Sequence, residues 1–262
     1  MILVDSHCHL DFPEYASDLT ETKQRARQAG VKFLISVGTT LGQSKRNITL
    51  AQNDKNLFAA VGIHPHEADR VANLIPSSLA SLRQLAASER VVAIGETGLD
   101  YYKSRSLPGN QKKLFRDQVN LALEIKKPLI LHIRDAYRDA LAILEKEYLP
   151  FCSLDFPGVA HSFGAGLWYA RRFWERGFFI GINGIVTFSN AAALREIVSQ
   201  IPLKSLLLET DAPFLAPEPF RGQRNEPAYI VEIARKVAEI KGLPVAKVAQ
   251  IITRNSKVLF GF

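Results

Sequence analysis

Two histidines near the N-terminus, His7 and His9, are the most informative residues of the chain for chemistry. They follow the apolar run 1–4, which predicts a strand. Residues two apart on a strand point to the same side, so both imidazoles can reach one point while Cys8 faces away. Two such imidazoles form half of a divalent-metal site. Taken alone, the pair is more simply interpreted as polar surface residues after a strand.

Other histidines and two acidic residues also fall at the ends of apolar runs. The candidate ligands are His7, His9, Glu96, His132, His161 and Asp211. Four imidazoles and two carboxylates suit two ions that share a bridge, and Glu96 is the natural bridge because a carboxylate has two oxygens. Each residue alone could be a turn residue or a helix N-cap. Their joint placement at several strand ends favours a metal site.

His64 and His66 differ from the candidate ligands because they flank Pro65. A rigid turn explains that spacing without any ligand role. We therefore expect a substrate-facing role for His64 rather than metal binding.

Eight short apolar runs alternate with amphipathic stretches of helical period. Strands are predicted at 2–5, 33–37, 58–62, 91–95, 129–132, 158–161, 178–181 and 205–209. Eight strands alternating with helices in 262 residues predict an α/β fold, a (β/α)₈ TIM barrel, as a single domain over residues 1–262. In this fold the strand ends gather at one mouth, where active sites lie. A doubly wound open sheet is the alternative, but that fold typically has a Gly-rich phosphate-binding loop after its first strand, where this chain has His7, Cys8 and His9.

The composition narrows the possible partners only modestly. The formal net charge of +7 favours a polyanion such as DNA, although the basic residues are scattered. Two cysteines make no disulfide framework, so a reducing cytoplasm is expected. We expect no signal peptide, no membrane association and no nucleotide cofactor, because the matching sequence patterns are absent. The chain is expected to be a monomer.

As a set, the motifs resemble the TatD-type metal-dependent deoxyribonucleases of the amidohydrolase-like metal-barrel superfamily. The matching strings are DSHCHLD at 5–11, GIHPH at 62–66, GETGLDYY at 95–102, HIRDA at 132–136, HSF at 161–163, LETDAP at 208–213 and RGQRNEP at 221–227. They span nearly the whole chain in order. The resemblance implies a TIM barrel, the six ligands named above and hydrolysis of DNA phosphodiester bonds, typically as a 3′-5′ exonuclease. Ser162 departs from the cysteine often found there, but it is no expected ligand.

The expected reaction uses two divalent ions per chain and a metal-activated water that attacks phosphorus. Asp211 would orient this water and accept its proton. The second ion or a protonated His64 would stabilise the leaving oxygen. Imidazoles and carboxylates without thiolate suit zinc, manganese, nickel or iron, and the resemblance adds magnesium.

Arg134, Arg221 and Tyr101 are the expected substrate contacts. The arginines could meet phosphates, and Tyr101, like its neighbour Tyr102, could stack on an unpaired base. For Arg224 an exposed loop position is at least as good an interpretation. Two other functions stay open. One is hydrolysis of another ester or amide, in a small molecule or an aminoacyl-tRNA. The other is a non-catalytic barrel with a structural metal, which is the weakest because structural sites are usually closed and thiolate-rich.

Overall fold

The computed structural model describes residues 1–103 and 105–262. Eight parallel strands alternate with helices, and the strand order in the sheet follows the chain from β1 to β8. This arrangement confirms the predicted (β/α)₈ barrel. The chain forms two compact units, one of residues 1–36 with 162–262 and the other of residues 37–161. Among the described residues, no helix is both long and apolar enough to cross a membrane.

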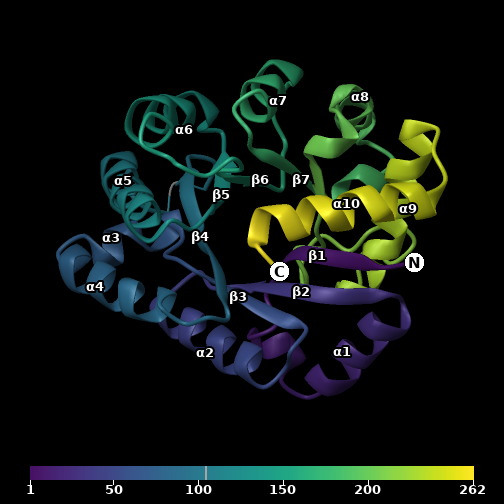
Figure 1. Ribbon diagram of the computed structural model, residues 1–262, viewed down its shortest axis with the longest axis horizontal. Coiled ribbons are helices and arrows are strands. Elements are labelled where there is room, and N and C mark those ends of the chain that lie inside the picture. Colours follow the sequence, from purple (N-terminus) through teal and green to yellow (C-terminus); the bar gives the residue numbers. More distant parts are fainter. Residues whose placement is uncertain (104) are drawn as a thin grey trace. The chain divides into compact units, whose positions relative to one another are not determined.

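The first unit contains the two ends of the chain. Its strands are β1 (Leu3–Cys8), β2 (Val31–Val37, whose last residue begins the second unit), β7 (Phe179–Ile182) and β8 (Leu206–Leu208). Its helices are α1 (Leu19–Gln28), α7 (Leu167–Trp174), α8 (Ala192–Gln200), α9 (Ile230–Lys241) and α10 (Val245–Phe260), with short helices η1 (Pro13–Tyr15), η4 (Gly184–Thr187), η5 (Leu203–Ser205) and η6 (Pro227–Tyr229). Strand β1 pairs with β2, and β7 pairs with β8. Helix α10 packs along β1 and covers it (Figure 1).

The second unit contains the four middle strands. They are β3 (Leu57–Val61), β4 (Val91–Asp100), β5 (Leu129–Arg134) and β6 (Gly158–His161), and they pair in that order. Its helices are α2 (Leu41–Gln52), α3 (Ala68–Val71), α4 (Ile75–Ala86), α5 (Pro108–Ile125) and α6 (Tyr137–Ile143), with the short helices η2 (Pro65–Glu67) and η3 (Leu144–Tyr148). Helix α5 begins with a proline, which suits a first helical position because its missing N–H would have no helical partner.

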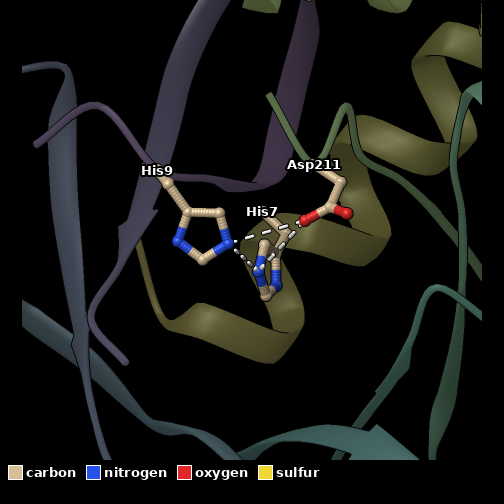
Figure 2. Close-up of side chains that lie close together, drawn as sticks. All are labelled: His7, His9 and Asp211. Atoms are coloured by element: carbon tan, nitrogen blue, oxygen red, sulfur yellow. Dashed lines mark hydrogen bonds and ion pairs between the residues drawn. The ribbon is translucent and has the colours of Figure 1, made fainter. Parts of the chain in front are cut away.

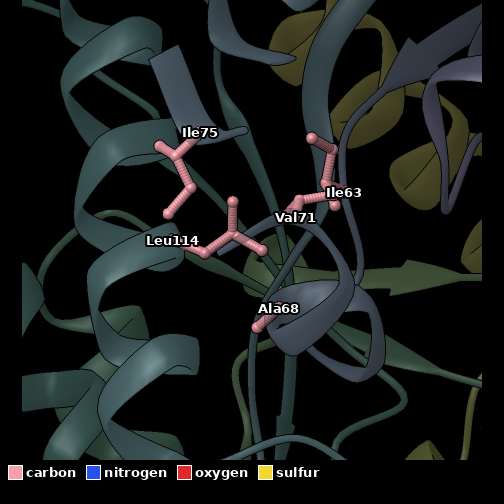
Figure 3. Close-up of a cluster of buried hydrophobic side chains, with 5 residues drawn as sticks. All are labelled: Ile63, Ala68, Val71, Ile75 and Leu114. Atoms are coloured by element: carbon pink, nitrogen blue, oxygen red, sulfur yellow. The ribbon is translucent and has the colours of Figure 1, made fainter. Parts of the chain in front are cut away.

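A small apolar cluster fixes the chain after β3. It joins residues of the β3 end, α3, α4 and α5: Ile63, Ala68, Val71, Ile75 and Leu114 (Figure 3). Each of these side chains is at most 9% exposed. The cluster therefore anchors the segment that carries His64 and His66 against the long helix α5.

Strand β4 is longer than predicted, because it runs to Asp100 rather than to residue 95. The added residues carry no apolar pattern, and the strand is held instead by parallel pairing with β5. Gly98 pairs with His132, and a Cβ placed on Gly98 would lie 2.0 Å from the His132 carbonyl oxygen. Only glycine allows the two strands to approach this closely.

Candidate metal centre

The first cluster consists of His7 and His9 from the end of β1 and Asp211 from the segment after β8 (Figure 2). The Nε2 atoms of the two histidines lie 3.2 Å apart. Oδ1 of Asp211 lies 3.8 Å from Nε2 of His7 and 3.5 Å from Nε2 of His9. The backbone sets this geometry, because Asp211 N–H donates to the His7 carbonyl and His9 N–H donates to the Ala212 carbonyl.

These separations suit one metal ion. Ligands at about 2.0–2.1 Å from a tetrahedral ion lie about 3.4 Å apart. The three donor atoms are 3.2–3.8 Å apart, so little rearrangement is needed. Cys8 faces away, as predicted, since its thiol donates to the Ile35 carbonyl at 3.4 Å. Burial raises the pKa of that thiol, so it offers no thiolate to the ion.

Asp5 is a buried residue of this region to which the sequence analysis gave no role. Its Oδ1 accepts the N–H groups of Thr210 at 2.9 Å and His7 at 3.3 Å, and its Oδ2 accepts the Thr210 hydroxyl at 2.5 Å. Burial raises the pKa of Asp5 to about 7. The side chain ties β1 to the segment that carries Asp211. Its place in the DSHCHLD string, two residues before a ligand, was the available signal.

The second cluster gathers around one carboxylate oxygen. Oε1 of Glu96, on β4, lies 2.7 Å from Nδ1 of His132, 3.7 Å from Nε2 of His64 and 3.9 Å from Nε2 of His161. The Glu96 side chain is only 5% exposed. Three imidazoles from β5, β6 and the chain after β3 thus meet a single buried acid.

His64 differs from the other two imidazoles. Its Nδ1 accepts the backbone N–H of His66 at 3.1 Å, so the neutral ring carries its proton on Nε2. Burial lowers the pKa of His64 well below its usual value, which keeps the ring neutral near pH 7. The expectation of a protonated His64 is therefore wrong, because a buried imidazolium would lose its hydration. Its Nε2–H can therefore donate a hydrogen bond toward the cluster but is not a metal ligand in this state.

Asp100, at the end of β4, is a second residue that sequence reasoning missed. It is 1% exposed. Its Oδ2 lies 3.0 Å from Nε2 of His132 and 2.9 Å from Nε2 of His66. Burial raises the pKa of Asp100, but hydrogen bonds from His132 and the backbone outweigh burial and hold it well below its usual range. The pKa of His132 is lowered by burial, yet bonds to Asp100 and Glu96 raise it to about 9.

Two buried glutamines of α5 hold the backbone beside the second cluster. Gln111 accepts the Asp100 N–H at 2.8 Å and donates to the Asp100 carbonyl at 2.9 Å. Gln118 pairs in the same way with Ile63, at 2.8 Å for both bonds, and donates to the Thr97 hydroxyl at 2.7 Å. Ile63 precedes His64 and Thr97 follows Glu96, so α5 positions both functional residues through their neighbours.

The structure separates the predicted substrate contacts into different environments. Arg134 is exposed, and its guanidinium lies 3.8 Å from the ring centre of Tyr102, which is 59% exposed. The Tyr101 hydroxyl instead donates to Asp139 at 2.8 Å. Tyr102, rather than Tyr101, therefore presents the open aromatic surface beside Arg134.

The two late arginines also differ. Arg221 is exposed, lies 3.8 Å from Glu218 and stacks over Phe188. Arg224 donates two hydrogen bonds of 2.7 Å to Asp18. That bidentate ion pair gives Arg224 a structural role, which agrees with leaving it out of the expected contacts.

The chain is similar to known hydrolases along its whole length. "Uncharacterized metal-dependent hydrolase YabD" of Bacillus subtilis is 39% identical and "Uncharacterized metal-dependent hydrolase YcfH" of Escherichia coli K12 is 40% identical. Each match covers 99% of this chain, with 99% of YabD and 96% of YcfH. The crystal structure of the TatD homologue YjjV from Escherichia coli K12 matches with a TM-score of 0.90 at 34% identity, covering 99% of this chain and 98% of YjjV.

The profile of the family described as TatD related DNase matches residues 4–261. This match covers every residue of both clusters. The chain therefore belongs to the TatD-related DNase family and is a metal-dependent hydrolase.

Proposed function

We propose that this protein is a deoxyribonuclease that hydrolyses phosphodiester bonds of DNA from the 3′ end, using a divalent ion in each of the two clusters. The observation that supports this most is the donor chemistry. His7, His9 and Asp211 present their donor atoms to one another in the first cluster, and Glu96 lies 2.7 Å from His132 and 3.9 Å from His161 in the second. Bound ions would supply a water acidified toward neutral pH and would offset charge on the phosphoryl oxygens.

Asp211 is assigned as the proton acceptor. Its side chain is 14% exposed, whereas those of His7 and His9 are 0% and 4% exposed. It is thus the member of the first cluster best placed to pass a proton to solvent. General bases of this kind must lie within hydrogen-bond reach of the attacking water.

His64 is assigned to the leaving oxygen. A neutral imidazole with its proton on Nε2 can donate a hydrogen bond to developing negative charge without entering the ligand set. Glu96 remains a ligand in this scheme, and its expected role as a bridge between two ions stays a prediction.

Arg134 and Tyr102 are assigned to the DNA strand. An exposed guanidinium suits a phosphate, and an exposed phenol ring suits stacking on an unpaired base. The formal net charge of +7 also favours a polyanionic substrate. Arg221 stays a predicted phosphate contact, and Tyr101 a predicted base contact.

The decisive experiment is digestion of single- and double-stranded DNA labelled at either end. The chelated protein is reloaded with zinc, manganese, magnesium, nickel or iron one at a time. The wild type is compared with His9→Ala, Glu96→Ala and Asp211→Ala, and with Arg83→Ala, whose guanidinium pairs with Glu124 on the surface, as control. We expect shortening from the 3′ end in the wild type and the control only.

Two outcomes would overturn the proposal. Full activity of Glu96→Ala would remove the second cluster from the mechanism. No cleavage of any nucleic acid by the metal-loaded protein would favour the alternative, a hydrolase of another ester or amide such as a small molecule or an aminoacyl-tRNA.

A further inference from the structure

The carboxylate of Asp100 is surrounded by hydrogen-bond donors. Oδ2 faces the Nε2 atoms of His132 at 3.0 Å and His66 at 2.9 Å. Oδ1 accepts the backbone N–H groups of Tyr102 at 3.0 Å and Lys103 at 3.2 Å. A carboxylate offers about four acceptor positions. All four are used, so Asp100 acts on its neighbours rather than as a ligand itself.

The contact with His132 decides where that ring keeps its proton. A neutral imidazole carries one N–H, and the nitrogen that donates to a carboxylate is the one that holds it. Without a metal, Nε2 of His132 lies 3.0 Å from Oδ2 of Asp100 and Nδ1 lies 2.7 Å from Oε1 of Glu96, so the protonated ring donates to both carboxylates. An ion in the second cluster would take the place of the Nδ1 proton, and the remaining proton stays on Nε2 because Asp100 accepts it.

We propose that Asp100 is a positioning residue for the second metal ion: it holds the His132 proton on Nε2 and thereby leaves Nδ1 to bind the metal. This inference rests on the proposed function, because it assumes an ion in the second cluster. Carboxylates that accept the second N–H of a ligating histidine fix both its tautomer and its orientation.

The position of Asp100 is itself rigid. Gln111, which is 1% exposed, holds both the N–H and the carbonyl of Asp100. Gly98 lets β4 approach β5 closely at His132. His66 donates to the same oxygen as His132, so the carboxylate joins η2, β4 and β5 at one atom.

A purely structural role for Asp100, as a cap for the turn at Tyr102 and Lys103, makes a different prediction. In Asp100→Asn, the amide oxygen must face the two backbone N–H groups, because these cannot change their protonation. The amide NH₂ then faces His132, whose ring can move its proton from one nitrogen to the other. Nε2 becomes the acceptor, the proton moves to Nδ1, and the metal-binding lone pair is lost. A capping role predicts instead that Asn is the milder substitution.

The test is calorimetric titration of chelated protein with Mn²⁺ for the wild type, Asp100→Asn, Asp100→Ala and His132→Ala. Asp117→Asn, whose carboxylate pairs with Lys113 on α5, is the matched control for charge. We expect Asp100→Asn to weaken Mn²⁺ binding by about 10–100-fold. The loss of Mn²⁺ affinity in Asp100→Asn should equal or exceed the loss in Asp100→Ala and approach the loss in His132→Ala. The control should bind Mn²⁺ as the wild type does.

Two-bond ¹H–¹⁵N spectra of histidine in the zinc-loaded proteins give a readout independent of affinity. We expect Nε2–H with metal-bound Nδ1 for His132 in the wild type, and Nδ1–H in Asp100→Asn. Wild-type affinity in Asp100→Asn, or a smaller loss than in Asp100→Ala, would overturn the inference while the proposed function stands. Unchanged binding in His132→Ala would instead refute the ligand set on which the proposed function depends. Circular dichroism of each variant checks its fold.

Discussion

Nδ1 of His132 lies 2.7 Å from Oε1 of Glu96, and this contact makes the metal-free protein sensitive to pH. Burial lowers the pKa of His132, but the bonds to Asp100 and Glu96 raise it to about 9, above the ordinary value of 6.5. The folded state therefore binds more protons than the unfolded state between these values. The stabilisation is complete below about pH 6.5 and is lost as the pH rises through about 9.

Urea unfolding of the chelated protein between about pH 6 and pH 9.5 tests this sign. We expect the free energy of unfolding to fall over that range in the wild type and to fall less in His132→Gln. Equal slopes for the two proteins would show that His132 is not the group responsible.

Gly98→Ala should be strongly destabilising. The new Cβ would lie 2.0 Å from the His132 carbonyl oxygen, and the positive φ of Gly98 is one that alanine rarely adopts. We expect a loss of more than about 3 kcal/mol in the free energy of unfolding, or failure to fold. The matched control is Gly109→Ala, which has no neighbour within 4 Å of its Cβ and lies in α5. That control should be neutral or more stable by up to about 1 kcal/mol.

Gln118→Leu should destabilise the protein without changing its surface. The substitution leaves the Ile63 N–H and carbonyl buried without their side-chain partner. Each such group costs about 1–3 kcal/mol, so the free energy of unfolding should fall by about 2 kcal/mol or more. Gln200→Leu, at an exposed position of α8, should change it by less than about 0.5 kcal/mol. Similar effects at both positions would show that the bonds of Gln118 to the Ile63 backbone do not stabilise the protein.

Arg134→Ala should weaken DNA binding and reduce its dependence on salt. If the guanidinium contacts one phosphate, the slope of log K against log salt concentration should become less steep by about 1. Fluorescence anisotropy with labelled single-stranded DNA, in a Glu96→Gln background that prevents cleavage, measures this slope. Arg224→Ala provides the contrast, because its guanidinium is held by Asp18. An unchanged slope in Arg134→Ala would remove that residue from the DNA contacts.

The sequence predicted the barrel and the candidate ligands for a physical reason. Apolar runs mark buried strands, and metal chemistry needs particular residue types, so His7 and Glu96 could be chosen as candidate ligands by residue type and position. Asp100 could not, because an acid that orders histidines and an acid that binds metal look alike in a sequence. Only the four surrounding donors distinguish them. The length of β4 was missed for a related reason, since its last residues depend on pairing with β5 rather than on their own apolarity.

The two buried glutamines of α5 restrict insertions and deletions in this helix. Gln111 and Gln118 are seven residues apart, about two helical turns, and so lie on one side of the helix. Gln111 is hydrogen-bonded to the backbone at the end of β4. Gln118 is hydrogen-bonded to the backbone just after β3 and to the hydroxyl of Thr97. Adding one residue between them would rotate one glutamine by about 100° relative to the other, so one of them would lose its hydrogen bonds to the backbone. The separation of the two glutamines along α5 thus fixes the relative positions of the backbone segments that carry His64, Glu96 and Asp100.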